Sequence, residues 1–337
     1  MGSHRRSVPS GFDRGAGAAL CALTTATAVL GAVPAGAAPH GDTRTEVDRL
    51  YEEAEQATEA YNQAHERAGT LRRQVDDAQD HIARLQQRVN TMREGLGSLA
   101  GAEYRSGGIA PVVALLLSSD PDDYLDKATT LGRIDARQAA RLTELQRTLR
   151  ALAQERAETV RKLADLERTR KDVASHKRTV EKKLGRARTL LDSLPYAERL
   201  AYGRASRDGR IDLSGLIGFG APNARAAAAV AAARSALGRP YVWGASGPSG
   251  FDCSGLMQWS YARAGIQLPR TSQEQRYAGR QIPLAEVRPG DLVVYRSDAG
   301  HVGMYVGNGQ VIHAPHPGAP VRYDPVGMMP IASVTRV

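Results

Sequence analysis

Three residues in the C-terminal third of the chain have side chains suited to thiol chemistry. Cys253 lies in the run Phe251-Asp252-Cys253-Ser254-Gly255-Leu256, and His301 and His313 follow it. The other cysteine, Cys21, falls inside an apolar N-terminal stretch. A lone cysteine with later histidines is the raw material of a thiol nucleophile and its base. Taken without further context, a buried structural thiol is an equally good interpretation of Cys253.

The expected local structure assigns each of these residues a different role. Cys253 lies where a helix is predicted to begin, and a helix N-terminus favours an anion, so we expect a lowered thiol pKa. His301 opens a predicted strand and is suited to act as the base and later as the acid. His313 ends the next strand, where it is expected to reach His301 and orient its imidazole. Backbone N–H groups at Cys253 or Ser254, or the Tyr241 hydroxyl, are candidates for an oxyanion hole.

A zinc site is the alternative use of the same residues, because cysteine and histidine are zinc ligands. No fourth ligand is evident near Cys253, His301 and His313 in the sequence, and Cys253 opens a predicted helix. We therefore expect neither a metal nor a cofactor.

The segment that carries these residues reads as an α+β domain over residues 223–337. Asn223 is a plausible N-cap for a helix over 224–237, and a second helix is expected from Cys253 to Ala264. Gly307-Asn308-Gly309 forms a short turn between two strands. Helices followed by a small antiparallel sheet indicate an α+β fold. The expected strands are 291–295, 302–306 and 310–313.

A long helical region is expected over residues 38–194. From Val47 to Leu99 apolar residues recur at three- and four-residue spacing without a miss, which indicates a coiled coil. A second helix is expected from Asp122 to Leu194, with Leu142 and Leu163 in its seam. An antiparallel hairpin is the simplest architecture, and a parallel dimer through the first helix is the alternative. Polar residues that we expect to interrupt the second seam are Asp135, Gln138, Arg156, Arg170 and Lys177.

Two less regular segments flank the second helix. Gly101 to Pro121 contains glycine and proline residues expected to break the first helix. Its apolar run Val112–Leu117 is either a partner-docking patch or a short helix packed on the hairpin. Residues 195–222 read as a linker, whose apolar residues Ile211–Phe219 are able to dock on a neighbour.

The N-terminus reads as a secretory signal over residues 1–37. Arg5, Arg6 and Arg14 form a positive region, residues 16–33 are apolar, and Ala35-Gly36-Ala37 resembles a cleavage site. The expected location is therefore outside the cell, at the wall or cell surface. An unprocessed membrane anchor is the alternative, although the apolar stretch is poor in leucine, isoleucine and phenylalanine.

The charge of the chain indicates which kinds of partner it binds. The formal net charge is +9, and residues 222–337 hold 11 arginines, no lysine and 6 acidic residues. A basic surface favours anionic partners such as wall polymers or lipid headgroups. No nucleic-acid motif accompanies it, so we expect no nucleic-acid partner.

Six motifs, in order, resemble the NlpC family of papain-like cell-wall endopeptidases. They are Pro240-Tyr241-Val242-Trp243-Gly244, Asp252-Cys253-Ser254-Gly255-Leu256, Leu268-Pro269-Arg270-Thr271-Ser272-Gln273, Pro289-Gly290-Asp291-Leu292-Val293, His301-Val302-Gly303-Met304-Tyr305-Val306-Gly307 and Ile312-His313-Ala314-Pro315. The resemblance implies a papain-like fold and a cysteine peptidase with Cys253 as nucleophile, His301 as base and His313 as third member. It also implies that Tyr241, Asp252 and Ser254 help to bind substrate. The implied reaction is cleavage of peptidoglycan stem peptides between D-Glu and diaminopimelate.

The helical region is similar to the coiled coils of actinobacterial and Gram-positive division hydrolases, with a looser match over Leu115–Leu131. That similarity implies autoinhibition and docking onto a division-site ABC-transporter-like membrane complex. We expect the coiled coil or the linker around Ile211–Phe219 to cover the Cys253 cleft until a partner removes it. The alternative is a non-catalytic coiled-coil scaffold or activator that binds the wall.

Overall fold

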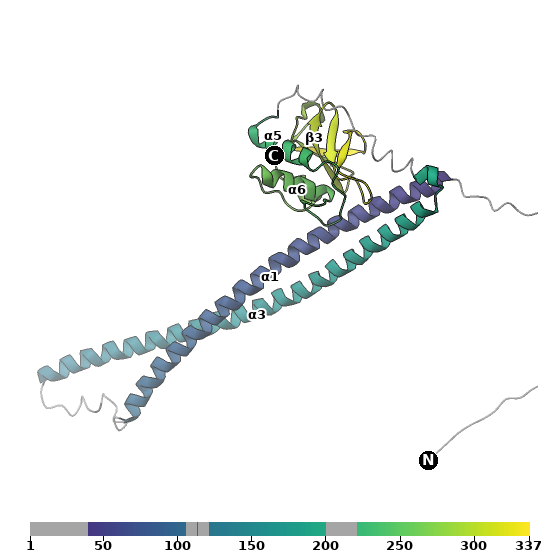
Figure 1. Cartoon of the computed structure of the whole chain (residues 1–337). Helices are drawn as coiled ribbons and strands as arrows, with labels where there is room; N and C mark the ends of the chain where they lie inside the picture. The colour runs from purple at the N-terminus through teal and green to yellow at the C-terminus, as the bar shows by residue number, and fades with distance from the viewer. Residues whose placement is uncertain (1–39, 106–112, 114–120, 200–220) are drawn as a thin grey trace, which may run out of the picture. The chain divides into compact units, whose positions relative to one another are not determined.

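The computed structural model describes residues 40–105, 113, 121–199 and 221–337 (Figure 1). The signal segment 1–37, most of the Val112–Leu117 run and the linker residues Ile211–Phe219 lie outside the described residues. Their predicted roles stay predictions. Within the described part of the chain, no helix combines the length and apolar character needed to cross a membrane.

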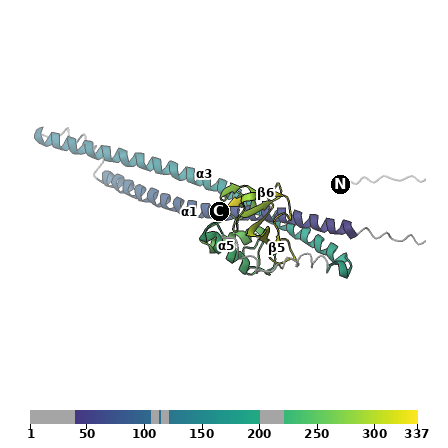
Figure 2. The same ribbon diagram turned by 90° about the horizontal axis from the view of Figure 1, so that it is seen from above.

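Two long helices form the N-terminal part and pair with each other along the chain (Figures 1 and 2). Helix α1 spans His40–Arg105 and helix α3 spans Pro121–Ser193. Near one end Val47 and Leu50 pack with Ala187, and further along Leu85 and Val89 pack with Leu152. Early residues of α1 thus meet late residues of α3, which confirms the antiparallel hairpin within one chain.

The seam differs from the expected one in α3. Leu142 and Leu163 are 49% and 40% exposed, and so lie outside the seam. Arg156, Arg170 and Lys177 are also exposed, so they do not interrupt it. Buried threonines take seam positions instead, because each hydroxyl donates to the carbonyl four residues earlier and needs no other partner. These threonines are Thr148, Thr159 and Thr169.

Helix α1 ends at Arg105, inside the segment Gly101–Pro121 where a break is expected, although it continues through Gly101 itself. One glycine costs a helix only about 1 kcal/mol relative to alanine, which a helix of this length tolerates.

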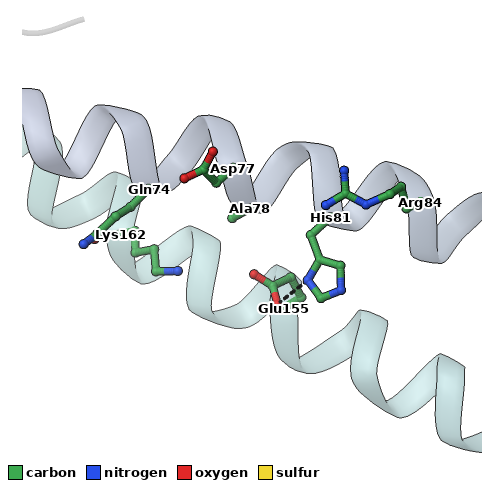
Figure 3. A pocket seen from close by; sticks show the side chains of 7 residues that line it. All are labelled: Gln74, Asp77, Ala78, His81, Arg84, Glu155 and Lys162. Atoms are coloured by element: carbon green, nitrogen blue, oxygen red, sulfur yellow. Dashed lines mark hydrogen bonds and ion pairs between the residues drawn. The ribbon is translucent and has the colours of Figure 1, made fainter.

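A polar hollow of about 500 Å³ lies between the two helices, where the seam residue is the small Ala78 (Figure 3). His81 Nδ1 of α1 lies 3.1 Å from Glu155 Oε2 of α3 across it. Charged side chains therefore line the pairing surface on both helices at this level. The remaining lining residues are Gln74, Asp77, Arg84 and Lys162.

The C-terminal domain contains a six-stranded antiparallel sheet in the order β1-β6-β2-β3-β4-β5. The expected strands appear as β2 (Leu292–Tyr295), β3 (His301–Gly307) and β4 (Gln310–His313). Three further strands were not predicted from the sequence: β1 (Arg280–Ile282), β5 (Arg322–Pro325) and β6 (Ile331–Arg336). Strands β1 and β5 are short, and β5 ends in proline, so neither gives a clear alternating pattern.

Helices and the sheet build the core of this domain. The helices are α5 (Ala224–Ser235), capped by Asn223 as expected, α6 (Cys253–Arg263) and the short α7 (Ser272–Gln275), with a 3-10 turn at Leu284–Glu286. Helix α6 packs against β3, with Leu256 and Met257 in the same cluster as Val302 and Met304. The predicted all-α hairpin followed by an α+β domain is therefore confirmed. This packing brings the start of α6 next to the start of β3.

Candidate active site

The start of α6 holds Cys253 in a fixed position. Asp252 is the N-cap, and its Oδ1 accepts a hydrogen bond of 2.7 Å from the Gly255 backbone N–H. Gly255 has no room for a side chain, because a Cβ there would collide with the Ala245 carbonyl. The Cys253 sulfur accepts a hydrogen bond from the Val302 N–H at the beginning of β3. The sulfur is thereby directed towards the strand that carries His301.

Strands β3, β4 and β5 each contribute one side chain to a hydrogen-bonded row. His301 Nε2 lies 2.8 Å from His313 Nδ1, and His313 Nε2 lies 2.8 Å from Asp324 Oδ2. Both histidines are fully buried. Gly303 lies beside His313, where a Cβ would come within 3.3 Å of the His313 Cβ. Arg322 completes the row by donating to Asp324.

The ionisation state of Asp324 determines which ring nitrogen of each histidine carries a proton. Burial raises the pKa of Asp324, but hydrogen bonds and charge from His313 and Arg322 outweigh burial and bring it below its ordinary value. An ionised carboxylate only accepts hydrogen bonds, so His313 carries its proton on Nε2. Burial lowers the pKa of His313 to about 4, so this ring is neutral and its Nδ1 accepts from His301 Nε2–H. His301 therefore has Nδ1 available to exchange a proton with a thiol.

Asp252 and Ser254, expected to bind substrate, take part in an ion-pair network beneath the cleft. Arg270 Nη1 donates to Asp252 Oδ1 at 3.0 Å and to Ser254 Oγ at 2.8 Å, and its Nη2 to Asp252 Oδ2 at 2.5 Å. Gly244 N–H also donates to Asp252 Oδ2, at 2.9 Å. A buried carboxylate needs such partners. Asp252 thus fixes the backbone around Cys253.

The third residue expected to bind substrate, Tyr241, lies in the same buried region and is 6% exposed. The pKa of its hydroxyl is well above its ordinary value, because of burial first and of the charges of Cys253 and Glu55 next. The hydroxyl therefore stays protonated and is able to donate a hydrogen bond.

Residues of α1 cover this site. Ser254 Oγ donates to Glu59 Oε1 at 2.7 Å, and the Ser272 N–H donates to Glu59 Oε2 at 2.9 Å. The Cys253 sulfur lies 3.7 Å from Glu59 Oε1. Glu59 is 2% exposed, so its carboxylate fills the space beside the nucleophile.

Glu55, one turn earlier on α1, fills the space beside the candidate base. Its Oε1 lies 3.5 Å from His301 Nδ1, and its Oε2 pairs with Arg296. His301 Nδ1 has no hydrogen-bond partner among the described residues. A carboxylate at this position competes with a thiolate for the proton and charge of His301.

Three further side chains extend the contact on both sides. Asn62 donates to Asp252 Oδ2 at 3.2 Å, and the Tyr61 ring meets Trp243 edge-on with ring centroids 5.1 Å apart. The Tyr51 ring stacks on His316 at 4.7 Å. We call Tyr51, Glu55, Glu59, Tyr61 and Asn62 the α1 cover.

The α1 cover reverses the expected ionisation of the thiol. The pKa of Cys253 is raised well above its ordinary value, first by burial and then by the charges of Glu59, Asp252 and Glu55. The expected lowering by the helix N-terminus is therefore wrong for this conformation, because desolvation and three carboxylates outweigh a dipole effect of about 0.3–1 kcal/mol. Cys253 is held as the unreactive thiol.

Among the described residues, no group of three or more histidine, cysteine, aspartate or glutamate side chains is placed to hold a metal ion. Cys253, His301 and His313 do not form such a group, since His313 uses its two ring nitrogens on His301 and Asp324.

Several site residues were missed by the sequence analysis: Glu55, Glu59, Arg270, Arg296 and Asp324. Arg270 lies inside one of the quoted motifs but gave no sign of its partner. Glu55 and Glu59 look like the solvated acids of any coiled coil. Their spacing of four residues places them on one helix face, which is the only signal they carry.

Residues 238–333 match the NlpC/P60 family. The C-terminal domain is therefore an NlpC/P60 domain, and the resemblance drawn from the six motifs is confirmed.

Curated relatives of this domain are named as endopeptidases. The chain is 44% identical over 123 residues to a probable endopeptidase of Corynebacterium glutamicum, covering 34% of this chain and 59% of the relative. It is 48% identical over 97 residues to probable endopeptidase p60 of Listeria monocytogenes, covering 28% and 20%. A probable endopeptidase of Mycobacterium tuberculosis is 44% identical over 99 residues, covering 29% and 26%. The chain thus spans less than two thirds of each of these relatives.

Solved structures similar to the chain include two isolated domains. The P60 domain of an antigen from Mycobacterium avium subspecies paratuberculosis is 36% identical with a TM-score of 0.32, covering 33% of this chain and 93% of that chain. The NlpC/p60 domain of the peptidoglycan hydrolase SagA is 37% identical with a TM-score of 0.32, covering 33% and 98%.

Removing the two carboxylates of the α1 cover is expected to expose the thiol. In a Cys21→Ser background, where Cys253 is the sole cysteine, Glu55→Arg with Glu59→Arg places cations against Arg296 and Arg270. We expect iodoacetamide to alkylate Cys253 at least about tenfold faster, because unfavourable charge contacts of this kind cost several kcal/mol. The matched control is Glu66→Arg with Glu94→Arg, which reverses two exposed acids of the same helix. Equal rates in all three proteins would show that α1 does not protect the thiol.

We expect the release of the α1 cover from Cys253 to depend on pH, because Glu59 gains or loses a proton. Burial first, then the charge of Asp252, raises the pKa of Glu59 to about 7 from its ordinary 4.5, although Ser254, Ser272 and Arg270 oppose the rise. The closed state binds this proton more tightly than the open state, so closure is strongest at low pH and weakens as pH rises to about 7. We expect the wild-type alkylation rate, divided by that of the Glu55→Arg/Glu59→Arg protein, to rise from pH 5 to 7 and then level off. Glu59→Gln, which stays neutral, should give a flat and low ratio; a ratio that falls with pH in wild type would contradict this account.

We expect Asp324→Asn to change which ring nitrogen of His313 carries the proton. An amide is able to donate to His313 Nε2, which moves the His313 proton to Nδ1 and removes the acceptor for His301 Nε2–H. In the Glu55→Arg/Glu59→Arg protein, we expect the pH midpoint of Cys253 alkylation to rise by about one unit or more, as the thiolate loses its imidazolium partner. The control is Glu286→Gln, an exposed acid outside the row. An unchanged midpoint would mean that Asp324 does not orient this pair.

Proposed function

We propose that this chain is an exported cell-wall hydrolase whose NlpC/P60 domain is a cysteine endopeptidase acting on peptidoglycan stem peptides. The observation that carries the proposal is the hydrogen-bonded row His301, His313 and Asp324, together with Cys253, whose sulfur accepts from the N–H of Val302, the residue after His301. These residues lie inside a domain whose relatives are named endopeptidases. The bond proposed for cleavage joins the γ-carbonyl of D-Glu to the amine of diaminopimelate.

In the proposed mechanism, His301 Nδ1 takes the proton of Cys253, and the thiolate attacks the γ-carbonyl carbon. The resulting oxyanion accepts hydrogen bonds from the backbone at Cys253 and from the Tyr241 hydroxyl, which is still protonated. His301 then gives its proton to the leaving amine, and a thioester with the enzyme remains. Water, deprotonated by His301, hydrolyses the thioester and returns the thiol.

His313 and Asp324 act behind the reacting atoms in this scheme. Asp324 keeps the His313 proton on Nε2, and His313 in turn holds the His301 ring with Nδ1 towards the sulfur. His313 remains neutral because of its low pKa, so it stabilises the imidazolium of His301 without competing for the positive charge.

The α1 cover is proposed to keep the enzyme inactive until it is released. Glu59 occupies the space where a substrate carbonyl would meet Cys253, and Glu55 occupies the space of the leaving amine beside His301. Substrate and cover therefore cannot occupy the cleft together. The sequence offers two candidates for this role, the coiled coil and the linker around Ile211–Phe219. The contacts of α1 with the site support the coiled coil.

Release requires a partner that binds the hairpin more tightly when α1 has left the cleft. We propose a division-site membrane complex of the ABC-transporter type in this role, which places the enzyme in cell separation or wall remodelling. Export through the segment 1–37 would bring the chain to the wall, where the arginine-rich domain meets anionic polymers.

The test uses full-length protein and defined muropeptides, with products read by mass spectrometry. We expect the Glu55→Arg/Glu59→Arg protein to split the muropeptides between D-Glu and diaminopimelate at least about tenfold faster than wild type, in parallel with thiol exposure. Adding Cys253→Ala should abolish cleavage, and Glu66→Arg/Glu94→Arg should behave like wild type.

Failure of the released protein to cleave, with binding to purified walls intact, would support the non-catalytic scaffold instead. Cleavage that survives Cys253→Ala would exclude the cysteine mechanism. Products from any other bond would exclude the proposed specificity.

A further inference from the structure

The guanidinium of Arg296 forms its ion pairs with α1 and not with its own domain, among the described residues. Arg296 follows β2 with a left-handed backbone, φ 65°, close in sequence to His301. Its backbone N–H is bonded to the Pro330 carbonyl. Among the described residues, both ion pairs of its guanidinium are to α1, with Glu52 and with Glu55, and none is to an acid of the NlpC/P60 domain.

With α1 in place, the Arg296 side chain is 14% exposed. Its Nε is buried without a hydrogen-bond partner among the described residues. When α1 leaves, this cation loses its partners while it remains beside the catalytic cleft. A partly buried arginine left unpaired favours binding of an anion, and its planar fork fits a carboxylate.

The carboxylate of Glu55 shows which position that anion would take. One oxygen lies 3.5 Å from His301 Nδ1, and the other pairs with Arg296. His301 Nδ1 is the atom that protonates the leaving amine in the proposed mechanism. A group bound to Arg296 in the same way therefore lies a few bonds from that amine.

An α-amino acid has this arrangement, because its amine and its carboxylate are joined through one carbon. We infer that Arg296 binds the free α-carboxylate of the amino acid whose amine leaves. This inference rests on the proposed function and names a specificity-determining residue for it. It implies a preference for stem peptides that end at the diamino acid over peptides in which that carboxylate is blocked.

The experiment compares three synthetic peptides of the form L-Ala-γ-D-Glu-diaminopimelate in the full-length Glu55→Arg/Glu59→Arg protein. The first has both carboxylates free, the second has the α-carboxylate amidated, and the third has the distal carboxylate amidated. We expect kcat/KM for the first to exceed that for the second by about 10- to 100-fold, the range of a hydrogen bond between charged groups. The third peptide should be cleaved as well as the first.

Variants at Arg296 and at a control arginine test whether Arg296 causes the preference for the free α-carboxylate. Arg296→Gln should bring the ratio of free acid to α-amide close to 1, and Arg296→Lys should retain part of it through a point charge. The matched control Arg280→Gln, at an exposed arginine of β1, should keep the full ratio.

Three results would overturn the inference while leaving the proposed function intact: equal cleavage of acid and α-amide, a preference that persists in Arg296→Gln, or discrimination only against the distal amide. Cleavage of none of the peptides by a protein whose Cys253 alkylates rapidly would refute the proposed function itself, and the inference with it.

Discussion

The structure depends on two carboxylates held inside a cleft built around a thiol. Glu55 and Glu59 are buried on α1; Glu59 accepts hydrogen bonds from Ser254 and the Ser272 N–H, and Glu55 lies beside His301 and pairs with Arg296. Burying a charge is expensive unless it is paired: Arg296 pairs with Glu55, whereas the hydrogen bonds from Ser254 and the Ser272 N–H offset the burial of Glu59 only in part, and its pKa is raised to about 7. The groups that we propose to act on a substrate therefore also bind the chain's own helix.

Much of the fold follows from the pattern of residues along the chain. The strict spacing from Val47 to Leu99 specifies a helix with one apolar seam, and the turn at Gly307-Asn308-Gly309 specifies the hairpin that brings His301 near His313. The outer strands were missed because β1 is only three residues long and β5 mixes arginine, tyrosine, aspartate and proline. Such strands are defined by their neighbours in the sheet more than by their own sequence.

The site was predictable to the extent that it is local. Cys253, His301 and His313 stand in recognisable contexts, whereas Asp324 reaches His313 only through the pairing of β4 with β5. Contacts such as Glu59 with Ser254, 195 residues apart, have no trace in either segment alone. The pKa of the Cys253 thiol is an example. The helix dipole, which is local, lowers this pKa, but burial and carboxylates from distant parts of the sequence raise it by more.

Helix α1 has two working faces, one packed on α3 and one on the cleft. Because both faces belong to one continuous helix of 66 residues, a rotation of α1 about its own axis that changes its packing on α3 also moves Glu55 and Glu59 relative to the thiol. The polar hollow at Ala78 and the buried threonines of α3 make the seam between the helices less uniformly apolar than a leucine zipper. We expect such a seam to resist sliding less than a uniformly apolar one, so that a pull on the far end of the hairpin reaches the contacts of Glu55 and Glu59 beside Cys253.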